Sequence, residues 1–213
     1  MKITIVYDND VRSGNLKGGW GFSSLIEIPN MQPILFDTGA DNPTLLSNLK
    51  GLGIDVKRIG IIVISHAHGD HTGGLLGTLE VNKEAEIYVP ASYGDTIPGR
   101  KVNTVTGPIR ISEKAFSSGE LKGIEQSLAI KTDKGILVIT GCSHPGVGEI
   151  IDAAAKFGKV YGIIGGFHGF HDFSRLSGLS LISPCHCTQY KSKIIELFPE
   201  QCIRCGAGLV LEQ

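Results

Sequence analysis

Runs of apolar, mostly β-branched residues alternate with glycine- and asparagine-rich turns along the chain, a pattern typical of strands joined by tight connections. Residues 59–64 form a nearly continuous apolar run, which predicts a strand buried on both faces and therefore a sheet covered by helices or by a second sheet. The pattern predicts further strands at residues 2–8, 21–28, 33–37, 86–89, 101–106, 125–132, 135–140, 159–164, 179–183, 202–204 and 209–211.

Three segments predict helices. Residues 44–50 follow Asp41-Asn42-Pro43, which offers a capping carboxylate and a proline at the first helical position, and glycines end this helix. The other two helices are predicted at residues 146–157 and 190–198. Early strands without helices and later strands alternating with them predict an α/β or α+β layered domain. One domain is expected over residues 1–213, because no linker-like stretch divides the chain.

Composition limits the classes of function. With 213 residues, 41% hydrophobic and 19% charged, the chain has ample material for a core, which excludes global disorder. Lys+Arg 20 against Asp+Glu 21 gives a net charge of -1, so neither nucleic acid nor an anionic membrane is an expected partner. No apolar run reaches the roughly 18 residues of a membrane span, and the first residues lack a secretory cleavage site. We expect a cytoplasmic protein with a small-molecule substrate; the oligomeric state stays open.

All seven histidines lie at or after the ends of predicted strands, where α/β proteins build ligand sites. The densest segment is His66-Ala67-His68-Gly69-Asp70-His71. Two histidines at i and i+2 on a turn are able to place both rings on one cation, while Asp70 and His71 face a neighbouring position. A polar loop with histidines bonded to backbone carbonyls is the alternative, but four potential ligands in six residues favour a shared metal.

The chain resembles the metallo-β-lactamase superfamily in several motifs. Residues 66–71 match its H-x-H-x-D-H signature, and residues 35–39 (L-F-D-T-G) resemble its early aspartate motif. Residues 140–146 (T-G-C-S-H-P-G) and 184–187 (P-C-H-C) are similar to its third motif and its last histidine motif. Closer still is the subgroup that carries G-C-S-H-P-G, G-G-F-H and P-C-H-C. Its members are named 7,8-dihydropterin-6-ylmethyl-aminobenzene ribofuranosyl phosphate synthases or metal-dependent hydrolases.

This resemblance implies a four-layer αβ/βα sandwich, which the strand pattern allows but does not select. It also implies a dinuclear site, with ligands His66, His68 and His144 at the first metal position and Asp70, His71 and His186 at the second. Asp37 is implied to brace the ligand loop by hydrogen bonds.

One position departs from the superfamily pattern. The fourth motif usually supplies an aspartate that bridges both metals, but here the matching strand end is Ile164-Gly165-Gly166-Phe167-His168, with no carboxylate until Asp172. His168 is a candidate for a ligand or a substrate contact, and His171 is a weaker one because Gly169-Phe170 is expected to turn it outward.

The implied chemistry is hydrolysis. A bound divalent ion lowers the pKa of its water from 15.7 to roughly 7, which suits cleavage of esters, thioesters, lactams, lactones or phosphodiesters. Asp70 is expected to act both as a ligand and in orienting that water. Two alternatives stay open: a transferase in which the metals grip the diphosphate of a pterin, and a non-catalytic metal or ligand sensor. Because redox di-iron members carry glutamate where this chain has His68, Zn is expected, with Mn, Fe, Co and Ni as alternatives.

The five cysteines and the substrate pocket allow weaker predictions. Cys185, Cys187, Cys202 and Cys205 form a four-thiol zinc site or, the favoured alternative, pack as small apolar side chains turned away from His186. Cys142 is expected to serve in packing. The Gly-, Pro- and Thr-rich residues 91–119 are a candidate lid, with Tyr93 and Arg100 as candidate substrate contacts. Trp20 is a candidate for the rim of the site or for the core.

Overall fold

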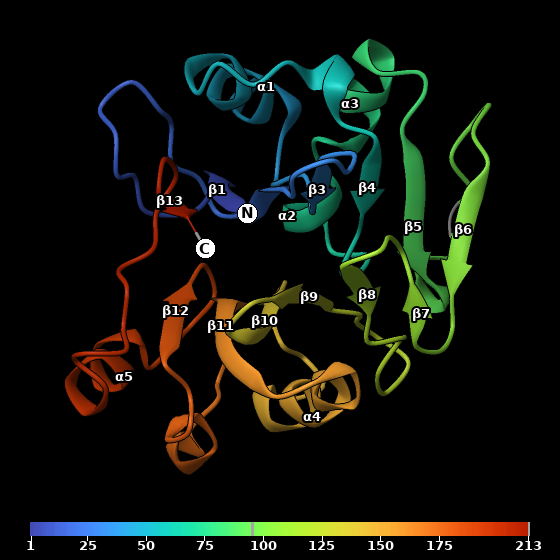
Figure 1. The fold of residues 1–213 in the computed structure, drawn as a ribbon. Helices are drawn as coiled ribbons and strands as arrows, with labels where there is room; N and C mark the ends of the chain where they lie inside the picture. The colour runs from blue at the N-terminus through green and yellow to red at the C-terminus, as the bar shows by residue number, and fades with distance from the viewer. Residues whose placement is uncertain (95, 213) are drawn as a thin grey trace.

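Two β-sheets form the centre of the computed structural model, which describes residues 1–94 and 96–212 (Figure 1). The order of the first sheet is β13 (Val210–Glu212), β1 (Lys2–Tyr7), β2 (Ser23–Glu27), β3 (Ile34–Phe36), β4 (Ile61–Val63), β5 (Glu86–Pro90) and β6 (Val102–Val105). The order of the second sheet is β12 (Leu181–Cys185), β11 (Val160–Gly166), β10 (Gly135–Thr140), β9 (Leu128–Thr132), β8 (Ala115–Ser117) and β7 (Ile109–Arg110).

The sheets pack face to face and helices cover their outer faces. The layer between the sheets holds fully buried side chains from both, including Ile5 and Phe36 of the first and Leu128 and Ile139 of the second. The first sheet is covered by α1 (Asn42–Gly51) and α3 (Leu75–Val81), and the second by α4 (Val147–Ala154) and α5 (Lys191–Leu197) (Figure 1). The predicted four-layer αβ/βα sandwich is therefore confirmed.

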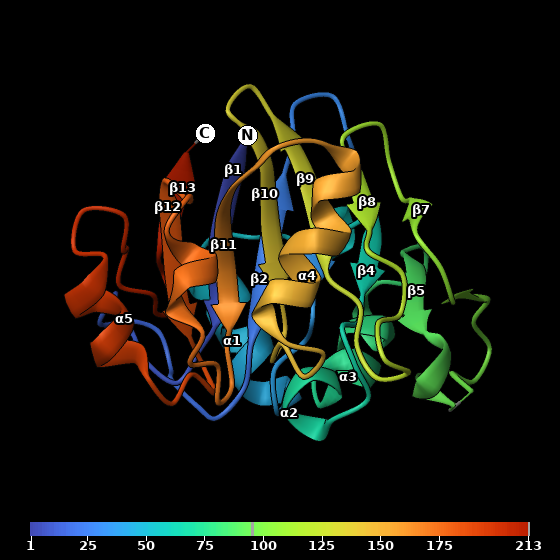
Figure 2. The same cartoon turned by 90° about the horizontal axis from the view of Figure 1, so that it is seen from below.

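Parallel strands bring distant loops to one edge of this sandwich. Strands β3 to β6 run parallel in the first sheet, and β10 to β12 run parallel in the second. The loops that follow them carry His66, His144, His168 and His186, as predicted. The short helix α2 (Gly69–Thr72) lies at the same end, opposite the two chain termini (Figure 2). This edge is where open α/β sheets bind ligands.

Several sequence predictions were wrong in detail. Residues 202–204 form no strand, since only Cys202 makes an isolated bridge with Ile182. The strand predicted from residue 125 begins at Leu128, and the sequence pattern missed α2, α3, β7 and β8. The candidate lid, residues 91–119, contains the predicted strand as β6 and also β7 and β8; its Asp95 lies outside the described residues. Among the described residues, no helix has the length and apolar character to cross a membrane.

Asp41 caps the N-terminus of α1, as the sequence predicted. Asp41 Oδ1 accepts a 2.7 Å hydrogen bond from the Thr44 amide, and Oδ2 accepts one of 2.8 Å from the Tyr7 hydroxyl. We expect Asp41→Ala to lower the free energy of unfolding by about 1–2 kcal/mol, measured by urea denaturation, because it removes both the cap and the tie to β1. Asp41→Asn retains an acceptor oxygen and should lose less; equal losses in the two variants would contradict a capping role.

Candidate metal centre

Three histidines from two sheets form the first group of candidate ligands. The donor atoms of His66, His68 and His144 all lie within 4.8 Å of one another. His66 Nε2 lies 3.1 Å from His68 Nδ1, and the His66 and His144 rings are 4.6 Å apart between centroids. Burial lowers the pKa of His66 to about 3, so its imidazole is neutral at pH 7, which is the form that binds a metal. The structure thus brings together the three predicted ligands of the first position.

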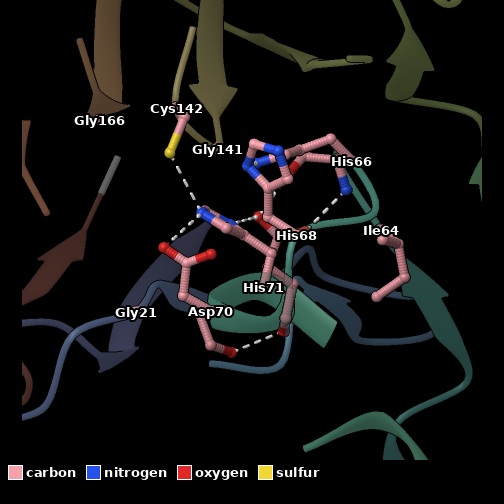
Figure 3. Close-up of polar contacts among 12 residues, drawn as sticks. Gly21, Ile64, His66, His68, Asp70, His71, Gly141, Cys142 and Gly166 are labelled. Atoms are coloured by element: carbon pink, nitrogen blue, oxygen red, sulfur yellow. Dashed lines mark hydrogen bonds and ion pairs between the residues drawn. The ribbon is translucent and has the colours of Figure 1, made fainter. Parts of the chain in front are cut away.

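The second group lies beside the first. The donor atoms of Asp70, His71 and His186 also lie within 4.8 Å of one another. Asp70 Oδ2 lies 3.2 Å from His186 Nε2 and 3.9 Å from His71 Nε2, and Figure 3 shows the Asp70 carboxylate turned toward the His71 ring. His186 Nε2 is buried, and its 3.2 Å contact with Asp70 lacks hydrogen-bond geometry, so no described residue gives it a hydrogen bond; a cation would satisfy this nitrogen. The donor chemistry therefore fits a divalent ion.

Asp37 holds the ligand loop after β4. Its Oδ1 accepts a 2.6 Å hydrogen bond from the Ser65 amide, and its Oδ2 accepts one of 2.7 Å from the Ser65 hydroxyl. The same Oδ2 lies 2.7 Å from Nδ1 of His71, while Ser65 Oγ lies 2.8 Å from Nδ1 of His66. These contacts leave Nε2 of both histidines facing the metal positions. Burial raises the pKa of Asp37 to about 7.

Glu125 holds the other ligand loop, a role that its place at the start of a predicted strand did not indicate. Its buried Oε1 accepts hydrogen bonds of 3.1, 3.0 and 2.9 Å from the amides of Gly141, Cys142 and Ser143. Its Oε2 accepts one of 2.9 Å from the His144 amide and lies 2.9 Å from His144 Nδ1. Burial opposes ionisation, but these hydrogen bonds lower the pKa of Glu125 to about 2. The carboxylate in turn raises the pKa of His144.

The ligand loops turn sharply where they leave the strands. Four of the six non-glycine residues with positive φ in the described chain lie at this site: Asp37, Ser143, His168 and His186. Such backbone costs energy and persists only where surrounding contacts enforce it. For His186, those contacts are a 2.9 Å hydrogen bond from its amide to Asp8 and a 3.0 Å contact of Nδ1 with Asn9 Oδ1. Neither Asp8 nor Asn9 was singled out from the sequence.

A pocket of about 390 Å³ opens beside the first metal position, lined by Ser143, His144, Gly146, Phe167, His168, Gly169, Phe170, His171 and Asp172. The exposed His168 ring lies 5.1 Å from that of His144, so His168 lines the site. His171 faces the same pocket, but it belongs to none of the donor groups found among the described residues. Trp20 is 62% exposed and its ring lies 5.1 Å from His186, which places it on the rim.

Residues from the predicted lid serve the fold instead. Arg100 donates hydrogen bonds to the carbonyl oxygens of Asn82 and Ala85, which ties its loop to the end of α3. Tyr93 packs against the core under α1 and α3. Neither residue lines the pocket beside His144.

The cysteines follow the favoured packing alternative in part: Cys185 and Cys205 are buried in the core between the sheets, and Cys202 packs against the core under α4 and α5. No set of donors among the described residues joins Cys185, Cys187, Cys202 and Cys205. Cys187 is not turned away from the site, since its donor atom groups with those of Cys142 and His186. Cys142 likewise does more than pack, because its sulfur lies 3.2 Å from His71 Nε2 (Figure 3).

Glu125 provides a test of loop support. We expect Glu125→Gln to weaken zinc binding at the His66–His68–His144 position by about 10–100-fold in a chelator competition titration, because His144 and its loop lose a charged acceptor. Glu120→Gln is the matched control: this half-buried residue accepts a hydrogen bond from the Ser92 amide in the neighbouring loop. Equal affinities in the two folded variants would show that Glu125 does not position the ligand.

Comparisons with known proteins identify the family. A family model described as the metallo-beta-lactamase superfamily matches residues 18–156. A 7,8-dihydropterin-6-methyl-4-(beta-D-ribofuranosyl)-aminobenzene-5'-phosphate synthase of Methanocaldococcus jannaschii is 30% identical, over 90% of this chain and 89% of the relative. The crystal structure of Tm1679, a metal-dependent hydrolase of the beta-lactamase superfamily, superposes with a TM-score of 0.77 at 26% identity, covering 100% of this chain and 99% of that one.

The short form of human tRNase Z shares the fold alone, with a TM-score of 0.67 at 15% identity, covering 100% of this chain and 99% of that one. The family match spans more than half of the described chain, and the relatives cover nearly all of it. The chain therefore belongs to the metallo-β-lactamase superfamily, a family of enzymes that bind divalent metal ions.

Proposed function

We propose that this enzyme is a metal-dependent hydrolase that cleaves an ester, thioester, lactone or phosphodiester type of bond in a small molecule. The observation that carries the proposal is the pair of three-donor groups at one edge of the sandwich, His66–His68–His144 and Asp70–His71–His186, beside an open pocket. Because the supporting carboxylates already orient the ligands, the site needs little rearrangement to bind its ions.

Each group of side chains has a distinct task in this proposal. The three histidines hold the first ion, and Asp70, His71 and His186 hold the second; imidazole-rich donor sets favour Zn, with Mn, Fe, Co and Ni as alternatives. The bound ions supply an acidified water and positive charge for the oxygens of the bond that breaks. Asp70, whose side chain is 22% exposed, acts as the catalytic carboxylate that orients the attacking water.

The pocket defines where the substrate binds. Its volume of about 390 Å³ lies in the range of small-molecule sites, and Phe170 offers an apolar wall. His168 stands next to His144 and is placed to donate a hydrogen bond to the substrate. With a net charge of -1 the chain shows no basic excess for nucleic acid, so we propose a small substrate despite the fold it shares with a tRNase.

The second candidate is a transferase that joins a dihydropterin-methyl diphosphate to an aminobenzene ribofuranosyl phosphate. It is favoured by the 30% identity to the archaeal synthase over 90% of this chain. In that reaction the same ions would hold the diphosphate leaving group, so the ligands do not distinguish the two readings. A non-catalytic metal or ligand sensor is a third reading, and the complete donor groups weigh against it.

Metal analysis tests the donor groups. We expect one to two divalent ions per purified chain, and the loss of one of them in His66→Ala and in His144→Ala, because each variant removes a nitrogen from the first position. His171→Ala is the control, since this exposed histidine lies near the site but outside the donor groups. A folded protein without metal, or histidine variants with unchanged metal content, would exclude the assignment.

A substrate screen separates the two reactions. The metal-loaded enzyme is assayed with phosphodiesters, thioesters and lactones, and with the pterin diphosphate in the presence and absence of its aminobenzene acceptor. We expect hydrolysis of at least one member of the first group, reduced by about 100-fold or more in Asp70→Asn because the water loses its orienting carboxylate. If the pterin diphosphate is the only substrate turned over, and reacts only when the acceptor is present, the transferase would replace the hydrolase proposal.

A further inference from the structure

A thiol stands between the two candidate metal positions. The sulfur of Cys142 groups with the donor atoms of His66, which belongs to the first position, and of His71, which belongs to the second. The same sulfur also groups with His186 of the second position and with Cys187. Among the described residues, no other donor outside the two metal groups joins members of both, so Cys142 faces the boundary between the two positions.

The contact with His71 has the geometry of two donors that share an ion. Cys142 Sγ lies 3.2 Å from Nε2 of His71 (Figure 3). Donors bound at about 2.0 and 2.3 Å to one tetrahedral zinc lie about 3.5 Å apart. Because the buried carboxylate of Asp37 contacts Nδ1 of His71, Nε2 is left to accept a hydrogen bond from the Cys142 thiol.

The end of β11 leaves room for a cysteine sulfur beside the candidate metal positions. β11 ends at Gly166, where a Cβ atom would lie 2.6 Å from Cys187 Sγ and 2.6 Å from the carbonyl oxygen of Gly141. A larger side chain at Gly166 would have to displace these atoms, so this position does not accommodate a carboxylate. Cys187 Sγ occupies the space and contacts the carbonyl oxygen of Cys142 at 3.8 Å.

The loop that carries Cys142 is rigidly held. The Cys142 amide donates a 3.0 Å hydrogen bond to buried Glu125, and the flanking amides of Gly141 and Ser143 donate to the same oxygen. The side chain itself is 3% exposed. The sulfur is therefore fixed between the donor groups before any ion binds, as expected of a preorganised ligand.

We propose that the Cys142 thiolate bridges the two metal ions, a role for which the superfamily pattern led us to expect a carboxylate. Cys187 is a positioning residue that packs against this sulfur and does not bind an ion. The inference rests on the proposed two-ion site. On binding, the S–H bond breaks, sulfur forms a bond to each ion and the proton leaves to solvent, so metal uptake releases one proton from Cys142.

X-ray absorption at the zinc edge tests the bridge without an activity assay. In the protein loaded with two zinc ions under a phosphine reductant, a bridging thiolate gives about one sulfur neighbour per zinc at about 2.3 Å, beside nitrogen neighbours at about 2.0–2.1 Å. A thiolate bound to one ion alone gives about half a sulfur per zinc, and an uninvolved thiol gives none. Cobalt-substituted protein provides a second readout, because thiolate ligands add a near-ultraviolet charge-transfer band.

Three serine variants identify the sulfur. We expect Cys142→Ser to lose the sulfur neighbour and the cobalt band, while Cys187→Ser keeps both. Cys202→Ser is the matched control, because its half-buried thiol faces the carbonyl oxygen of Ile194 in α5 and should leave both signals unchanged. Circular dichroism establishes whether each variant is folded. If Cys142→Ser does not fold, the number of sulfur neighbours in the wild-type protein and in Cys187→Ser still tests whether Cys142 bridges the two ions.

The outcomes separate the bridge from the wider proposal. Two bound zinc ions with half a sulfur neighbour each, or with none, would overturn the bridge and leave the proposed hydrolase intact. Retention of the sulfur signal in Cys142→Ser, or its loss in Cys187→Ser, would overturn the assignment to Cys142. Failure of the wild-type protein to bind two ions would overturn the bridge together with the two-ion site on which it rests.

Discussion

Two buried carboxylates hold the site together. Asp37 anchors the loop with the first histidines, and Glu125 anchors the loop with Cys142 and His144. A buried carboxylate is costly unless hydrogen bonds surround it, and here the groups that satisfy each carboxylate are those that orient metal ligands. The folding requirement and the functional requirement are therefore met by the same contacts. This explains why the ligand loops keep unfavourable backbone conformations at Asp37 and Ser143.

The sequence predicted the parts of this arrangement that depend on local pattern. Residues 66–71 place four potential donors in one turn, and the strand before them is recognisable from its apolar run, so the ligand loop and its position at a sheet edge could both be predicted. The helix after Asp41 was predictable because its cap and proline are adjacent in sequence. The order of strands in each sheet carries no such local signal, and it was the family resemblance that implied the sandwich.

Contacts between distant segments account for what was missed. Glu125 contacts His144 across 19 positions, and Asn9 contacts His186 across 177, so neither partner is visible from local spacing. The alternation rule placed Cys187 away from the metals, but the chain turns at His186, where φ is 45°, and a regular strand pattern no longer applies. Glycines interrupt the sequence pattern of the short helices α2 and α3, so these helices were not predicted. Glycine is needed at positions 73 and 74 because the loop at residues 38–40 lies too close to leave room for a side chain.

The site divides into a fixed side and an open side, and this division bears on its chemistry. His66, His71, His186 and Cys142 are buried among carboxylates and backbone amides, whereas His68 and His168 are exposed and His168 lines the pocket. Substitution of one of these buried residues would change which ions bind, because it would also leave the hydrogen-bond partners of that residue unsatisfied. Variation around His168 and Phe170 would change which substrate meets those ions. Relatives with one ligand pattern are thus free to differ in reaction, which is why a shared motif identifies this metal centre more securely than it identifies the substrate.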